Sequence, residues 1–348
     1  MADVPNVVVD IAPVHSLVAR VMGDLGEAKI VVQPGASPHG YSMRPSEAAA
    51  LQAADLVFWM GKDLTPWLED AIDTLAEDAS VTSLLETDGT KLRDFREGAL
   101  FEVHDHDDHE DHDEEGHDDH DHEEHAEGKD HDDHDHEEHD EHDHDEHAKD
   151  DDHEHEEHAE HDDHDHEEHA DHEGHDHGEH DPHAWLSPQN ASNWLNVIAA
   201  QLSVSDPENA GTYFANAAAG RAVLEELAVE VNATLDSVRG GSFVVFHDAY
   251  QYFEDDFDFP ASGAISLSDA SDPSPARIAE IQERVVDEGV DCVLAEPQFN
   301  PGIVATVLEG SEARTSVIDP MGFELEPGID FYPQLIRNMA QALVDCLN

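Results

Sequence analysis

The chain has few of the residues that several functional classes require. Its 348 residues include two cysteines, Cys292 and Cys346, which form no CxxC pair and no zinc-finger spacing. Only 15 lysines and arginines stand against 85 aspartates and glutamates, which gives a net charge of −70. This balance disfavours nucleic acid or an anionic membrane surface as a partner, and it favours cations. No hydrophobic run approaches the ~20 residues of a membrane span.

The cysteines and the first residues leave the compartment open. Cys292 and Cys346 form either one disulfide, in an oxidising compartment, or two buried thiols. The start Met-Ala-Asp-Val lacks the basic and apolar regions of a signal peptide. If the protein is exported, we therefore expect this to be the mature chain, with Met1 added as a start residue.

An unusual tract runs from His104 to His180. These 77 residues hold 26 of the 30 histidines, 41 of the 85 acids and two lysines, a net charge of −39. They contain no aromatic residue, and the unit DDHDHEEHA occurs at 118–126 and again at 162–170. Such a segment buries too little apolar surface to offset the entropy of ordering, so we predict that it is disordered or at most ordered by metal.

The tract's side chains predict metal handling. Imidazole and carboxylate groups are ligands for zinc above all, with nickel and copper competing. The histidines are too closely and too variably spaced for one defined site, which favours many weak, exchanging sites. An acidic linker without a metal role is the alternative, but ordinary linkers are not this rich in histidine.

The remaining 271 residues, with 13 basic and 44 acidic residues, are enough for two compact lobes or one large α/β domain. Before the tract, short β-branched runs alternate with helical segments. The predicted strands are Val7–Ile11, Lys29–Gln33, Leu56–Met60 and Val81–Leu85, and the predicted helices are Pro13–Leu25, Glu47–Ala54 and Pro66–Ala76. This alternation predicts a parallel, doubly wound sheet with sites at the carboxyl ends of its strands.

After the tract, Ser187-Pro188 predicts the start of a helix that ends near Leu202. Leu224, Leu227, Val231, Leu235 and Val238 then follow a helical period, so Pro207–Arg239 is predicted as one helix of ~50 Å that spans two lobes. A second α/β unit follows, with predicted strands Ser242–Phe246, Asp291–Ala295 and Thr315–Ile318 and predicted helices Ser274–Glu288 and Tyr332–Leu347.

Only four histidines lie outside the tract: His15, His39, His183 and His247. His15 falls within a predicted helix without ligand spacing, and we interpret it as structural. The other three lie on loops or strand ends beside Pro or Asp, in three separate parts of the chain. Three imidazoles with an open or carboxylate-filled fourth position are a common tetrahedral zinc set. A lone His at a strand end is more often structural, so the spacing alone does not decide whether these three histidines share one metal site.

Five motifs resemble those of a known family, the cluster A-I metal-binding proteins of bacterial ABC importers, and within it the ZnuA-type zinc-binding proteins. They are GASPHGYSMRPS at 35–46, HAWLSP at 183–188, FHDAY at 246–250, AEPQF at 295–299 and IDPMG at 318–322. The resemblance covers the whole chain except the tract. A His- and acid-rich insert before the second motif is itself typical of the zinc-type members.

The resemblance implies a fold and a ligand set. It implies two doubly wound α/β lobes joined by one long rigid helix, with metal held in the cleft between them by His39, His183 and His247. Related manganese binders have Glu at the position of His247, so His there indicates zinc. The fourth position goes to Asp319 or to water, because Pro38 replaces a Glu that ligates in some members. The resemblance also implies a Cys292–Cys346 disulfide.

The expected organisation is an N-terminal lobe of residues 1–103 and 181–205, the tract 104–180, a linking helix 206–239, and a C-terminal lobe 240–348. We expect a monomeric periplasmic receptor that captures Zn²⁺ as transported ligand and delivers it to an ABC permease. Its affinity should fall as pH drops through ~6.5 and imidazoles protonate. The alternatives are a zinc buffer or chaperone built on the tract, or a zinc hydrolase with Glu296 as general base.

Overall fold

The computed structural model describes residues 4–96, 101, 180–267 and 273–348. The described residues form one compact unit. The predicted disorder and weak metal sites of the tract therefore lie outside the described residues, apart from its last residue, His180.

Within the described residues, two four-stranded parallel sheets form the two lobes. The first has the order β2-β1-β3-β4 and consists of β1 (Val7–Val9), β2 (Ala28–Ile30), β3 (Leu56–Trp59) and β4 (Ser80–Ser83). The second repeats this topology as β6-β5-β7-β8, with β5 (Phe243–His247), β6 (Gly263–Ser266), β7 (Cys292–Ala295) and β8 (Arg314–Val317). The central strands β1, β3 and β5 are buried along their whole length, which explains their apolar sequences.

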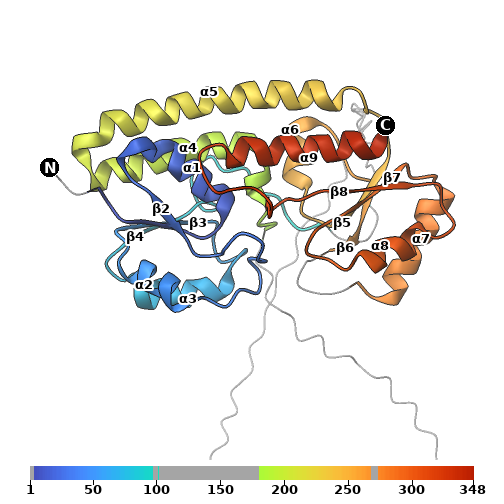
Figure 1. The fold of residues 1–348 in the computed structure, drawn as a ribbon, viewed down its shortest axis with the longest axis horizontal. Coiled ribbons are helices and arrows are strands. Elements are labelled where there is room, and N and C mark those ends of the chain that lie inside the picture. The colour runs from blue at the N-terminus through green and yellow to red at the C-terminus, as the bar shows by residue number, and fades with distance from the viewer. Residues whose placement is uncertain (1–3, 97–100, 102–179, 268–272) are drawn as a thin grey trace, which may run out of the picture. The chain divides into compact units, whose positions relative to one another are not determined.

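Helices cover both faces of each sheet (Figure 1). They are α1 (Ala12–Met22), α2 (Pro45–Gln52), α3 (Pro66–Leu75), α4 (Pro188–Ser205), α5 (Ala210–Leu235), α6 (Gln251–Phe257), α7 (Pro275–Asp287), α8 (Pro301–Leu308) and α9 (Phe331–Leu347), with short 3₁₀ turns η1 (Gly23–Leu25), η2 (Ala184–Leu186) and η3 (Pro207–Asn209). One apolar core packs α2 and α3 against the first sheet, and another packs α7 and α8 against the second. The third core is continuous through both lobes.

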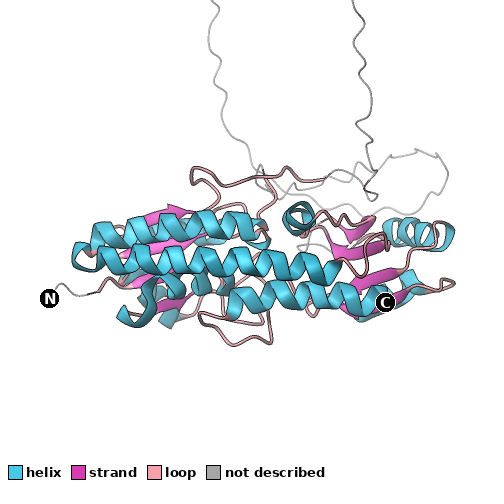
Figure 2. Ribbon diagram, turned by 90° about the horizontal axis from the view of Figure 1, so that it is seen from above, coloured by secondary structure: helices cyan, strands magenta, loops and turns pink. Residues whose placement is uncertain are grey.

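Helix α5 joins the lobes through this third core (Figure 2). Its buried face repeats at helical spacing and comprises Tyr213, Ala217, Gly220, Leu224, Leu227, Val231 and Leu235. It packs against α1 and α4 at one end and against α6 and α9 at the other. The linking helix is thus confirmed. Among the described residues, no helix is both long and apolar enough to cross a membrane.

The predicted bounds of this helix are wrong at both ends. Residues Pro207–Asn209 form a separate 3₁₀ turn, and α5 ends at Leu235, so its 26 residues span about 39 Å rather than ~50 Å. The helix ends where the Arg239 guanidinium donates hydrogen bonds to the carbonyls of Phe257 and Asp258, which draws the chain toward the second sheet. Three elements escaped prediction altogether: α6, β6 and α8, each eight residues or shorter.

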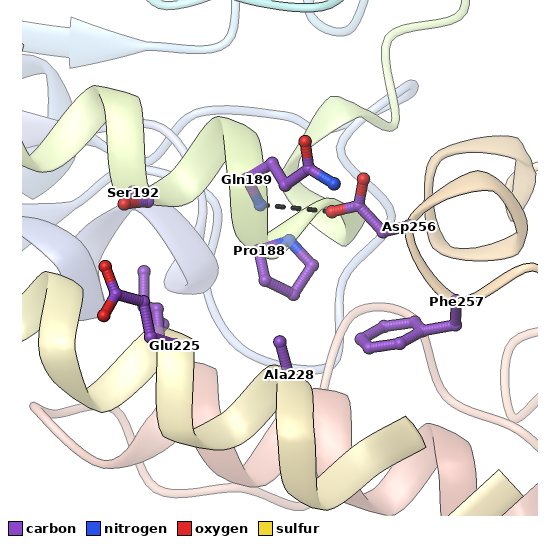
Figure 3. A pocket seen from close by; sticks show the side chains of 8 residues that line it. Pro188, Gln189, Ser192, Glu225, Ala228, Asp256 and Phe257 are labelled. Carbon is purple, nitrogen blue, oxygen red and sulfur yellow. Dashed lines mark hydrogen bonds between the residues drawn. The ribbon is translucent and has the colours of Figure 1, made fainter. Parts of the chain in front are cut away.

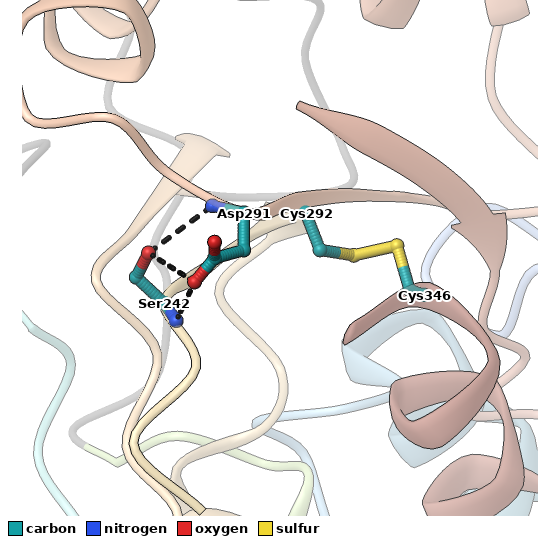
Figure 4. Close-up of a disulfide and its surroundings, with 4 residues drawn as sticks. All are labelled: Ser242, Asp291, Cys292 and Cys346. Carbon is teal, nitrogen blue, oxygen red and sulfur yellow. Dashed lines mark hydrogen bonds between the residues drawn. A yellow bond between two sulfur atoms is a disulfide. The ribbon is translucent and has the colours of Figure 1, made fainter. Parts of the chain in front are cut away.

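The two cysteines form a disulfide between β7 and α9 (Figure 4). The Cα atoms of Cys292 and Cys346 are 5.7 Å apart, and both side chains are buried. The bond closes a loop of 54 residues and attaches the last helix to its lobe. Beside it, the Asp291 carboxylate accepts hydrogen bonds from the backbone N and the hydroxyl of Ser242, which fixes the start of β5.

A buried carboxyl group follows the central strand of the first sheet. Asp10 is fully buried and accepts hydrogen bonds from the backbone N atoms of Ile11 and Met60, at 2.8 and 2.6 Å. Burial raises the pKa of this group to about 7, although the two amides oppose the shift. The native state therefore holds a proton at Asp10 between about pH 4 and pH 7 that the unfolded chain releases.

We predict that Asp10 makes the protein less stable as pH rises through this window. The loss amounts to about 4 kcal/mol at most, from a pKa difference of about three units. Denaturant unfolding at pH 5 and pH 8 checks it: in the Asp10→Asn variant the decrease in unfolding free energy should be smaller than in the parent chain. Asp73→Asn, at an exposed position on α3, is the control. Equal pH dependence in the Asp10→Asn variant and the parent would contradict the prediction.

Candidate metal site

A small cavity lies where loops of the two lobes meet. It has a volume of about 10 Å³, roughly the space that one water molecule requires. The residues that line it are Ser37, Pro38, His39, His183, Trp185, His247, Gln298, Pro320, Met321 and Phe323. All three histidines singled out from the sequence are present, and they come from three separate segments of the chain. His15, which lies on α1, is not among the lining residues.

His39 lies on the loop between β2 and α2, and side chains of two helices hold this loop. The indole N–H of Trp67, on α3, donates a hydrogen bond of 2.7 Å to the Pro38 carbonyl. The buried Glu47 carboxylate, in the first turn of α2, accepts hydrogen bonds from the Tyr41 hydroxyl and the Arg44 backbone N, at 2.9 and 2.6 Å. These contacts fix the backbone on both sides of the half-buried imidazole.

His183 precedes η2 and is buried. Its Nδ1 lies 2.7 Å from the Asp181 Oδ1, and the same oxygen accepts the His183 backbone N–H at 3.0 Å. The other Asp181 oxygen accepts a hydrogen bond of 3.1 Å from the Nε2 of Gln251, on α6. Because an ionised carboxylate only accepts, Nδ1 carries the proton and the lone pair of the ring is on Nε2.

His247 is the last residue of β5, and its partner follows the neighbouring strand β7. Its Nδ1 lies 2.6 Å from the Oε1 of the buried Glu296, which also accepts the His247 backbone N–H at 3.2 Å. The other Glu296 oxygen accepts a hydrogen bond of 2.8 Å from the Gln298 Nε2. Both buried histidines are thus oriented by a carboxylate that an amide side chain holds in turn. This is the arrangement usual for histidine ligands of metals.

The spacing of the three rings suits one small ion. The His183 ring centroid lies 5.7 Å from that of His39 and 5.3 Å from that of His247. Two imidazoles bound through Nε2 at tetrahedral angles to one zinc would have centroids about 5 Å apart, given Zn–N bonds of about 2.0–2.1 Å. Among the described residues, no group of three His, Cys, Asp or Glu side chains already meets metal-site geometry.

Asp319 lies near this cavity but does not line it. One of its oxygens accepts hydrogen bonds from the backbone N atoms of Met321 and Gly322, and the other accepts one from that of Phe323, at 3.1, 2.8 and 2.6 Å. Burial raises the pKa of this carboxyl, and the three amides oppose the shift. Asp319 shapes the loop that brings Pro320, Met321 and Phe323 to the cavity.

Another cavity has a different character (Figure 3). It has a volume of about 270 Å³, is mostly apolar, and lies between α4, α5 and α6. Its acidic residues are Glu225 and Asp256, and the Asp256 carboxylate accepts hydrogen bonds from the Ser187 hydroxyl and the Gln189 backbone N. No histidine or cysteine lines it, so it offers no ligand set for zinc.

A buried ion cluster beside His247 was not predicted from the sequence. Arg96, just before the tract, donates hydrogen bonds to both carboxylate oxygens of Asp248 and to both of Glu254, and its guanidinium stacks over the Phe101 ring. Asp248 and Glu254 are buried. This segment also pairs with the residues after the tract, because the Asp181 N–H donates to the Arg93 carbonyl at 2.8 Å. Arg96 is therefore held beside Asp248, the residue after His247, and Arg93 beside Asp181, two residues before His183.

A protein-family model, described as zinc-uptake complex component A, periplasmic, matches residues 7–346. The chain belongs to the ZnuA family. Relatives from Brucella suis and Paracoccus denitrificans are 45% and 44% identical to it over 344 and 347 residues. The alignments cover 99% of this chain and 92% and 93% of the relatives, and both relatives are named high-affinity zinc uptake system protein ZnuA.

Solved ZnuA structures share the fold. A crystal structure of ZnuA matches with a TM-score of 0.67 and 18% identity, over 99% of this chain and all of that one. A ZnuA deletion mutant with zinc bound gives the same TM-score and identity and covers 99% of each chain. The family and the two-lobed architecture that the motifs suggested are therefore confirmed.

Proposed function

We propose that this chain is the zinc-binding receptor of an ABC importer, which captures Zn²⁺ and delivers it to the membrane permease. The observation that carries the proposal is the cavity that His39, His183 and His247 line together. Membership of the ZnuA family supports zinc as the cargo, since its relatives are named for high-affinity zinc uptake. The ion is the transported ligand and takes part in no covalent step.

The proposed ligands are the Nε2 atoms of His39, His183 and His247. Asp181 and Glu296 support this assignment for the two buried rings, because they bind the Nδ1 side. For the fourth position we favour water over Asp319. Asp319 does not line the cavity, and its carboxylate already accepts three backbone hydrogen bonds.

The contacts of Glu296 argue against a hydrolase. A general base must reach a metal-bound water, but this carboxylate accepts from the His247 ring with one oxygen and from Gln298 with the other. We therefore propose that the protein is a receptor and has no enzymatic activity. The His- and acid-rich tract would gather or sense zinc, as an accessory to the defined site.

The location and partners follow from the same chemistry. A disulfide between Cys292 and Cys346 suits the periplasm, where disulfides persist. The net charge of −70 disfavours nucleic acid as a partner. We propose a periplasmic monomer whose partners are the zinc ion and the permease.

Deleting His104–His180 distinguishes the proposed receptor function from the alternative of a zinc buffer. We predict that the shortened chain keeps one tight zinc site, measured by competition with a chromogenic chelator, while the weak sites disappear. The defined ligands remain, because His39, His183 and His247 all lie outside the deletion. If the shortened chain bound zinc no more tightly than free imidazole does, the tract would be the functional part and the receptor proposal would fail.

A further inference from the structure

Gln298 carries a buried oxygen that has no hydrogen-bond partner. The residue follows Glu296 at the carboxyl end of β7 and lines the cavity of the three histidines. Its Nε2 donates to the Glu296 carboxylate at 2.8 Å, and a carboxylate can only accept, so the two ends of the amide are not interchangeable. The remaining Oε1 is one of seven buried side-chain N or O atoms without a partner among the described residues.

A buried, unsatisfied acceptor is costly unless a ligand or water satisfies it. The residues around the Gln298 Oε1 indicate which group would donate a hydrogen bond to it. The cavity has space for about one water molecule, and its lining combines three histidines with Pro320, Met321 and Phe323. Besides the histidines, the lining residues with a polar side-chain atom are Ser37, Trp185 and Gln298, and the Trp185 Nε1 already donates to the Pro320 carbonyl. Among the described lining residues, Gln298 is the one whose side-chain oxygen is buried without a partner.

We propose that Gln298 is a positioning residue for the cargo ion, and that its Oε1 accepts a hydrogen bond from the water in the fourth position on zinc. This inference rests on the proposed function. It explains why the fourth ligand need not come from the protein. Water bound to Zn²⁺ is a strong hydrogen-bond donor, so an amide oxygen can orient it. Because the amide is neutral, it adds no negative charge that would slow release of the ion.

The same contact also links the fourth position to His247. The Gln298 amide connects the proposed water, through Nε2, to Glu296 and from there to the His247 Nδ1. A zinc ion bound to both this water and the His247 ring would therefore contact the two ends of a single hydrogen-bonded series, from the water through Gln298 and Glu296 to His247. Asp181 has an equivalent amide in Gln251, but Gln251 does not line the cavity. This difference supplies a matched control.

The test uses the chain without His104–His180, with Zn²⁺ affinity measured by chelator competition and Co²⁺ binding followed by its visible absorption. Gln298→Met and Gln251→Met each remove an amide donor from a carboxylate that orients a histidine. We expect Gln298→Met to weaken Zn²⁺ binding by about 10–100-fold and by at least tenfold more than Gln251→Met does. The Co²⁺ absorption bands should change in Gln298→Met alone, because only that variant loses a partner of the fourth ligand.

Gln298→Glu keeps an acceptor oxygen at the same place but loses the donor to Glu296. It should bind Zn²⁺ at least as tightly as the parent does, whereas a role through Glu296 alone would make it as weak as Gln298→Met. Equal affinities of the two methionine variants, or a Co²⁺ spectrum of Gln298→Met identical to that of the parent, would overturn the inference. If the parent itself showed no His183-dependent Co²⁺ binding, the proposed function would fail instead. Unchanged circular dichroism establishes that each variant is folded.

Discussion

Replacing His183 by alanine in the chain without His104–His180 is expected to lower zinc affinity by at least about 100-fold. His183 is the central ring of the three, within 5.7 Å of His39 and 5.3 Å of His247 between ring centroids. Loss of partners that only orient a ligand costs about 10–100-fold in metal affinity, so loss of a direct ligand should cost more. Competition with a chromogenic chelator measures the change.

The control for this prediction is His15→Ala. His15 is also a partly buried histidine, but it lies on α1 and does not line the cavity. We expect this variant to bind zinc like the parent. His39→Ala and His247→Ala should resemble His183→Ala, because each removes one of the three proposed nitrogen ligands. Parental affinity in all three cavity variants would rule out the assigned ligand set.

The second large effect is on stability. Replacing Arg96 by methionine leaves the buried Asp248 and Glu254 carboxylates without their cation. Removing one partner from a buried ion pair typically costs about 3–5 kcal/mol, and we expect a loss of unfolding free energy in this range at pH 7.5. Chemical denaturation measures it. Arg337→Met, which breaks a half-exposed pair with Glu230, should cost less than about 1 kcal/mol.

The pH dependence gives this prediction a second readout. Burial raises the pKa of Asp248 and of Glu254, and the Arg96 guanidinium opposes both shifts. In Arg96→Met the pKa values of Asp248 and Glu254 in the folded state therefore rise further above their values in the unfolded chain. Stability is lost as pH rises from the unfolded-state pKa values to the folded-state ones. The difference in unfolding free energy between Arg96→Met and the parent chain should therefore be smaller at pH 4.5. Adding Asp248→Asn and Glu254→Gln should restore part of it at pH 7.5, and a pH-independent deficit would contradict the account.

The sequence predicted the architecture because its strongest signals are local. Buried runs such as Val7–Val9 and the Ser187-Pro188 helix start need only neighbouring residues to be recognised, and the Ser187 hydroxyl does accept the Asn190 backbone N–H. Strand β6 was missed because its sequence GAIS has a single β-branched residue, and helix α6 because no side chain caps its start. Helix α8 does begin with Asn300-Pro301, so a usable start signal was present. The disulfide was left open by the residues themselves and was implied only by the family resemblance.

The candidate site was predictable in part. His39, His183 and His247 were conspicuous as the few histidines at loops and strand ends, where parallel sheets place their sites. The contacts of their supporting groups were harder to predict. Glu296 is 49 residues from His247, and Arg96 is 152 residues from Asp248, so only the pairing of β5 with β7 and the close approach of the two lobes bring them together. Asp181 was within two residues of His183, and its acidic side chain beside a candidate ligand was a usable signal.

The central claim is that one zinc ion binds between the three histidines. The most direct measurement is a crystal structure of the zinc-loaded chain without His104–His180, with the ion located by anomalous scattering at the zinc absorption edge. The account predicts one strong peak at about 2.0–2.1 Å from the Nε2 atoms of His39, His183 and His247. A zinc peak elsewhere, with these three nitrogens uncoordinated, would contradict it.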